Sequence, residues 1–168
     1  TSIGGAVVRS DLVYTHTQTD SYLSAVANVS YSWLWGGHNM TGVLEVFFND
    51  LGLDESDYPD LAQNKDLVDR LARGELFTLG RRYIAGAVTV ELTPLLNLMP
   101  ALFINTGDQS GLVQLAGRYD LTQNWQLITA LNVPFGSAGT EFGGLDSGVE
   151  GRQLGVGPAL FTQLAFYF

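Results

Sequence analysis

Residues that could carry out catalysis are scarce in this chain of 168 residues, which contains two histidines and no cysteine. His16 has Ser10 and Ser21 nearby in the sequence, and a serine activated by a histidine is a common nucleophile. No nucleophile motif surrounds either serine, and the sequence assigns no acidic residue to orient the histidine. We therefore predict no catalytic residue, with a Ser/His pair on His16 as the alternative.

Carboxylates crowd the segment between residues 50 and 60. Hard cations such as Ca²⁺ prefer carboxylate oxygens, which makes Asp54, Glu55 and Asp57 the weak candidates for a metal site. Their spacing does not match an EF-hand loop, and acidic side chains in an exposed loop are usually just solvated. We therefore expect no bound metal and no other cofactor.

Isolated charges occur in stretches where polar and apolar residues alternate. Successive side chains of a strand point to opposite faces, so these charges are predicted to share a polar face with residues such as Asn28 and Gln114. Opposite charges there are expected to pair, because an unpaired buried charge is costly. The predicted polar network consists of Arg9, Asp11, Glu45, Glu91, Arg118 and Asp120.

Eight stretches of this kind predict eight strands, and one segment between them predicts a short helix. The helix is expected between Asp60 and Arg73, where Leu67 and Leu71 recur at helical spacing after Pro59. The predicted strands lie near 4–15, 21–35, 40–49, 79–92, 98–107, 111–121, 124–136 and 156–168.

The polar faces of the strands indicate what kind of sheet they form. They carry mostly Ser, Ala, Gly, Asn and Gln, and Lys65 is the only lysine, whereas exposed faces of soluble sheets commonly carry lysine. Small polar residues suit a crowded interior, so the apolar faces are predicted to meet lipid. The fold class is then all-β: an antiparallel up-and-down transmembrane β-barrel of eight strands, forming one domain over residues 1–168.

Connections and aromatic residues agree with this topology. The turns after the second, fourth and sixth strands are short, whereas long loops are expected near 50–78, with the helix, and near 136–155, as in barrels with short periplasmic turns and long external loops. Tyr14, Phe48, Tyr83 and Phe135 lie near the long-loop end. A membrane-interface girdle is predicted at the short-turn end, formed by Tyr31, Trp33, Trp35, Tyr119, Trp125, Phe166 and Phe168.

The last nine residues resemble the C-terminal signal of bacterial outer-membrane β-barrels, which typically close with an aromatic strand and a final Phe. The segments 72–77, 91–97 and 119–124 are similar to the C-terminal part of longer proteobacterial outer-membrane proteins of unassigned function. The resemblance implies a barrel located in the bacterial outer membrane. It implies no catalytic or binding residue.

Three functions remain open on these grounds. The first is a non-enzymatic barrel with a structural or surface-interaction role, whose lumen is filled by side chains, because eight strands enclose little more than that. The second is the C-terminal segment of a larger channel or transporter barrel, in which the same charges line an ion pathway. The third is a lipid-modifying outer-membrane enzyme that uses His16.

The expected partners follow from this location. They are the lipid bilayer, lipopolysaccharide, which divalent ions could bridge to the acidic loop, and the barrel-assembly machinery, which would engage the C-terminal strand. The net charge of −9 argues against a nucleic acid, because phosphate binding needs clustered Lys and Arg. The sequence leaves the oligomeric state open.

Overall fold

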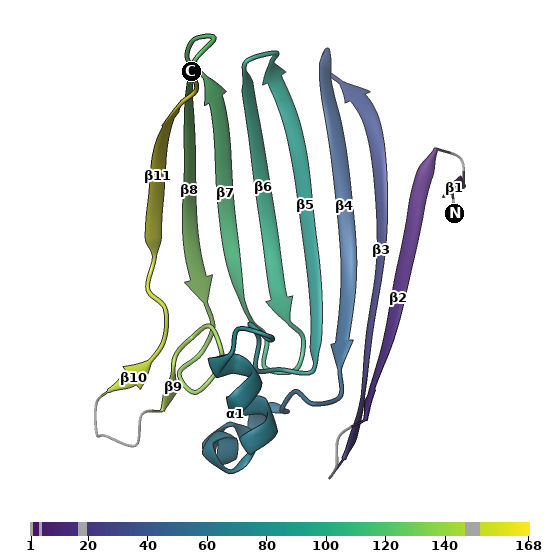
Figure 1. Cartoon of the computed structure of the whole chain (residues 1–168), viewed down its shortest axis with the longest axis vertical. Helices are drawn as coiled ribbons and strands as arrows, with labels where there is room; N and C mark the ends of the chain where they lie inside the picture. Colours follow the sequence, from purple (N-terminus) through teal and green to yellow (C-terminus); the bar gives the residue numbers. More distant parts are fainter. Residues whose placement is uncertain (1, 4, 17–19, 147–151) are drawn as a thin grey trace.

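The computed structural model describes residues 2–3, 5–16, 20–146 and 152–168. Its main feature is an antiparallel sheet in which each of eight long strands is hydrogen-bonded to the next one along the chain (Figure 1). These strands are β2 (Ala6–His16), β3 (Ser21–Trp35), β4 (His38–Asn49), β5 (Arg82–Thr93), β6 (Leu96–Asn105), β7 (Ser110–Asp120), β8 (Trp125–Phe135) and β11 (Ala159–Phe166).

Three two-residue strands accompany this meander. β1 (Ser2–Ile3) pairs with the beginning of β2, whereas β9 (Leu145–Asp146) and β10 (Gln153–Leu154) pair with each other in a separate small sheet. The sequence did not predict these three, because a two-residue pairing leaves no alternation to detect. The eight long strands were predicted, with ends that differ by a few residues.

The register gives the sheet one polar and one apolar face. Residues directly opposite each other on paired strands share a face. Asn28 lies opposite Glu45, and Gln114 lies opposite Asn132. On the other face, valines and leucines meet in the same way, for example Val113 opposite Val133 and Leu131 opposite Leu160. The predicted alternation is therefore confirmed across the sheet.

The apolar face is uncovered. Leu44, Leu115 and Leu160 are exposed by 52%, 46% and 72%, whereas Gln114 and Asn132 on the polar face are half-buried. The hydrophobic core of the chain lies outside the sheet, in the connection between β4 and β5, where Leu51, Leu53, Tyr58 and Leu67 are buried together.

The sheet is open. β2 and β11 are its outer long strands, and they do not pair with each other within the described residues (Figure 1). The predicted closure of these eight strands into a barrel is therefore not seen. Alternation determines which side chains share a face, whereas closure depends on strand tilt and stagger, which alternation does not encode. Because eight is an even number, β2 and β11 run antiparallel to each other.

The predicted short helix is present and begins later than expected. A 3-10 helix, Glu55–Gln63, contains Pro59, and the α-helix α1 follows at Lys65–Ala72. Asn64 caps α1, since its side-chain oxygen accepts the backbone N–H of Leu67 at 3.2 Å. Figure 1 shows α1 at the end of the sheet opposite the short turns. No helix among the described residues is long and apolar enough to cross a membrane.

Gly111 is predicted to be required for the packing of β7. A Cβ at this position would meet the carbonyl oxygen of Phe103 and would lie 2.7 Å from the Phe135 ring. We expect Gly111→Ala to lower the free energy of unfolding by about 1–3 kcal/mol, measured by urea unfolding in detergent. Gly86→Ala is the matched control, because its Cβ would meet nothing closer than 3.9 Å. Equal effects of the two variants would contradict this account of the packing.

Candidate functional site

A buried polar cluster lies where the loops meet the polar face of the sheet. Asn105 and Ser110, at the adjoining ends of β6 and β7, are 0% exposed, and Tyr83 near the start of β5 is 2% exposed. The loops contribute Tyr58 from the β4–β5 connection, Asp108 from the β6–β7 turn and Glu141 from the β8–β9 connection. We call these six residues the loop anchor.

Glu141 is the acceptor at the centre of the loop anchor. Its Oε2 accepts the hydroxyl of Tyr83 at 2.6 Å and the amide Nδ2 of Asn105 at 2.8 Å. Its Oε1 accepts the backbone N–H of Leu79 at 2.7 Å. One carboxyl group therefore joins the β8–β9 connection to β5, to β6 and to the end of the β4–β5 connection.

Asp108 is a second shared acceptor, in the β6–β7 turn. Its Oδ2 accepts the Tyr58 hydroxyl at 3.0 Å and the backbone N–H of Glu141 at 2.8 Å. Its Oδ1 accepts the backbone N–H and the hydroxyl of Ser110 at 2.9 and 2.7 Å. Asn105 links the two halves of the cluster, because its Nδ2 also donates to the Tyr58 hydroxyl at 2.9 Å.

The loop anchor contains two acidic residues, Asp108 and Glu141, and neither forms an ion pair with a basic residue within the described residues. Burial raises the pKa of the Glu141 carboxyl above its ordinary value, and nearby Asp108 raises it further, against the lowering effect of the hydrogen bonds. Burial and Asp108 also raise the pKa of Tyr58. The cluster offers hydrogen bonds and no activated nucleophile, so its chemistry is that of an anchor for loops.

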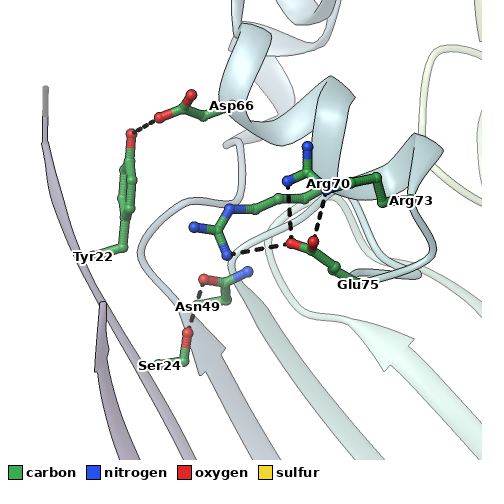
Figure 2. A network of polar contacts seen from close by, with 7 residues as sticks. All are labelled: Tyr22, Ser24, Asn49, Asp66, Arg70, Arg73 and Glu75. Carbon is green, nitrogen blue, oxygen red and sulfur yellow. Dashed lines mark hydrogen bonds and ion pairs between the residues drawn. The ribbon is translucent and has the colours of Figure 1, made fainter. Parts of the chain in front are cut away.

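A second polar network holds the β4–β5 connection near β3 and β4 (Figure 2). The Tyr22 hydroxyl donates to Asp66 of α1 at 3.0 Å, and the Ser24 hydroxyl donates to Asn49 at 3.0 Å. Within the connection, Glu75 accepts the Nε of Arg73 at 2.7 Å and lies 3.7 Å from Arg70. The Ser24–Asn49 bond lies within the sheet, whereas the bond from Tyr22 to Asp66 attaches the connection to the polar face, as the loop anchor does.

Of the three metal candidates, only Asp54 has a side chain that the structure describes. Asp54 lies 3.4 Å from Arg81 and 3.9 Å from Arg82, so its carboxylate faces two cations. The side chains of Glu55 and Asp57 lie outside the described residues. The described part of the chain holds no group of three potential metal ligands.

The structure brings His16 close to one of the two serines considered with it. The Nδ1 of His16 and the hydroxyl of Ser21 are 2.8 Å apart, as exposed cross-strand partners of β2 and β3. Ser10 lies opposite Ala27, six residues away from His16 along β2. The pair His16 and Ser21 is thus a geometric possibility for the enzyme alternative, and Ser10 is separated from it.

The predicted polar network shares one face, as expected from alternation, but only two of its members form an ion pair. The register places all six charged residues on the polar face. Arg118 and Asp120 are 3.6 Å apart along β7. Glu45 accepts Nδ2 of Asn28 at 3.3 Å and Glu91 accepts Nδ2 of Asn39 at 2.6 Å. Arg9 and Asp11 form no ion pair with another described residue.

The aromatic residues of the predicted girdle lie on the apolar face near the short turns. Trp125 and Phe166 are opposite each other, with ring centroids 4.8 Å apart, and Phe166 is 6.4 Å from Phe168. The rings of Tyr31 and Trp33 stack along β3 at 6.2 Å. The register places the remaining members, Trp35 and Tyr119, on the same face.

Tyr83 does not share a face with Tyr14, Phe48 and Phe135, the other aromatic residues near the long-loop end. It lies on the polar face, where its ring stacks on Phe103 at 4.9 Å beneath the loops. The sequence contained a signal for this placement, because Tyr83 and Glu91 are an even number of residues apart in β5 and therefore lie on the same face. The sequence analysis did not single out Tyr58, Asp108 and Glu141, because their loop positions carry no periodicity, nor Ser110, which lies at the very start of β7.

No protein-family model, no curated protein and no solved structure matches this chain.

Removal of the Glu141 carboxyl is predicted to release the loops. Glu141→Ala leaves two donors of the loop anchor and the backbone N–H of Leu79 without their acceptor, which costs about 2 kcal/mol and shifts the docking equilibrium by ~30-fold. We expect faster cleavage of the β4–β5 connection by thermolysin, with the sheet retained in circular dichroism. Glu141→Gln is the control, since it keeps an acceptor oxygen. Unchanged cleavage of the alanine variant would contradict the anchoring role.

Loop docking is also predicted to weaken as the pH rises. The undocked carboxyl of Glu141 has its ordinary pKa near 4.5, and the docked carboxyl has a higher one, so docking binds a proton. Docking is therefore strongest below the ordinary pKa and weakens as the pH rises through the docked pKa. Amide exchange at Leu79, corrected for its intrinsic pH dependence, measures this. The same profile in Glu141→Gln would rule out Glu141 as the titrating group.

Proposed function

We propose that this chain forms part of the wall of a transmembrane β-barrel in the bacterial outer membrane, with the apolar face toward lipid and the polar face toward the lumen. One observation carries the proposal: the apolar face is exposed over eight strands and is almost free of charge. It holds no Asp, Glu or Lys in the described strands, and its one arginine, Arg82, lies at the loop end. Water-soluble monomers rarely expose apolar patches larger than a few hundred Å².

The dimensions of the strands support this orientation. β8 has 11 residues and carries Trp125 and Phe135 at its two ends on the apolar face. At about 3.4 Å per residue and a tilt of about 40°, its apolar stretch covers ~26 Å of membrane, close to the ~25 Å apolar band of outer-membrane barrels. Arg82 lies at the rim, where an arginine can reach the lipid headgroups.

The open edges favour a channel or transporter segment over a small plugged barrel. Unpaired backbone groups of β2 and β11 are costly in hydrocarbon, so both edges need partner strands. Within the described residues the eight strands do not close on themselves. Because the two edge strands are antiparallel, an antiparallel barrel could be completed by any even number of further strands. The loops lie at the rim of the polar face, where they would narrow the mouth of a wider lumen.

The proposal predicts opposite responses at adjacent residues of β7. Leu115 lies on the apolar face and Gln114 on the polar face, both near the middle of the strand. Leu115→Arg should destabilise the membrane-inserted state by about 2–4 kcal/mol and deplete the protein from outer-membrane fractions, because arginine at the bilayer midplane is costly. Gln114→Arg should insert normally.

The measurement is flotation of the refolded chain with lipid vesicles, together with resistance to extraction by carbonate. If Leu115→Arg floats as well as Gln114→Arg, the apolar face does not meet lipid. A soluble assembly in which a second protein layer covers that face would then explain its composition, and analytical ultracentrifugation without detergent would detect it.

A further inference from the structure

A depression on the polar face lies between β4 and β7, away from the loop anchor. Its volume is about 270 Å³, near the lower limit of small-molecule sites. Its floor is lined by Ala85, Ala87 and Ala101. Because these side chains are small, a bound molecule can come close to the backbone of β5 and β6 there. Phe103 lies on one side of the depression, and Glu45 and Gln114 add polar groups to its lining.

The corner formed by Glu45 and Asn28 has more hydrogen-bond acceptors than donors. Nδ2 of Asn28 donates a hydrogen bond to Oε2 of Glu45 at 3.3 Å. The other polar atom of this side-chain amide is the acceptor Oδ1. This Oδ1 is buried and has no hydrogen-bond partner within the described residues. Glu45 forms no ion pair within the described residues. Arg9 lies opposite Asn28 on the neighbouring strand but forms no ion pair with the Glu45 carboxylate.

The carboxylate of Glu45 lines the depression and has no ion-pair partner within the described residues, whereas Oδ1 of Asn28 is buried out of reach of a solute. A positively charged N–H donor complements this carboxylate. The adjoining alanines and Phe103 fit an apolar body. Charge and shape thus indicate the same kind of molecule.

We propose that the depression binds a small aromatic ammonium compound, with its ring over the alanine floor beside Phe103 and its ammonium group at the Glu45 carboxylate. This inference rests on the proposed function, since the polar face must line a water-filled lumen for a solute to reach it. It names the class of solute that the lumen would recognise. The binding is reversible and involves no covalent step.

The test uses 4-fluorophenethylammonium as the probe and the full chain refolded in detergent micelles. Fluorine NMR measures its binding, and the shift in protein-free micelles is subtracted. We expect saturable binding that weakens at least tenfold in Glu45→Gln and is lost in Ala101→Leu, which fills the depression. Glu91→Gln is the matched control, because Glu91 is an acid of the same face outside the depression, and it should bind as tightly as the unaltered chain.

Two outcomes would overturn the proposal. The first is the absence of saturable binding, which would leave the depression to a side chain of a neighbouring strand in the wider barrel. The second is equal weakening by Glu45→Gln and Glu91→Gln, which would show attraction by net charge only. Vesicle flotation of the same protein is read separately: flotation without probe binding overturns this inference alone, whereas probe binding without flotation contradicts the membrane location and supports the site.

Discussion

The hydrogen-bonded register of the antiparallel strands is the constraint on which the rest of the structure depends. Because side chains alternate between faces, a shift of one residue between two strands would exchange their polar and apolar faces. The observed register keeps Asn28 opposite Glu45 near one edge of the sheet and Leu131 opposite Leu160 at the other. Every further property, including the uncovered apolar face and the lumen that we propose, follows from this pairing.

The loops carry the hydrophobic core that the sheet lacks. Leu51, Leu53, Tyr58 and Leu67 bury each other in the β4–β5 connection, and this unit is attached to the sheet by polar contacts. Tyr58 belongs to both, since its ring joins the apolar cluster while its hydroxyl donates to Asp108. Apart from the contact between Arg82 and Asp54 at the loop end, the attachment uses the polar face, which leaves the rest of the apolar face free. A soluble sheet would more simply place such a unit over its apolar face.

The two faces therefore differ in what they still need. The apolar face needs an apolar surrounding, the strand edges need backbone partners, and the Glu45 carboxylate has no cationic partner within the described residues. In the function that we propose, a membrane supplies the first, additional strands of a wider barrel the second, and a cationic solute in the lumen the third. We prefer a channel segment to a plugged barrel because this one arrangement would meet all three requirements.

Local patterns in the sequence were sufficient to predict the strands, the short helix and the face on which each charged residue of the polar network lies. Alternation is a property of neighbouring residues, so Arg118 and Asp120 could be assigned together without any knowledge of the fold. The tertiary structure decided what alternation cannot express: that the edges stay open, and that Tyr83 lies beneath loops. It also joined Glu141 to Tyr83, which is 58 positions away in the sequence. Such contacts depend on how loops fold back over a sheet, and that geometry has no period for a sequence to display.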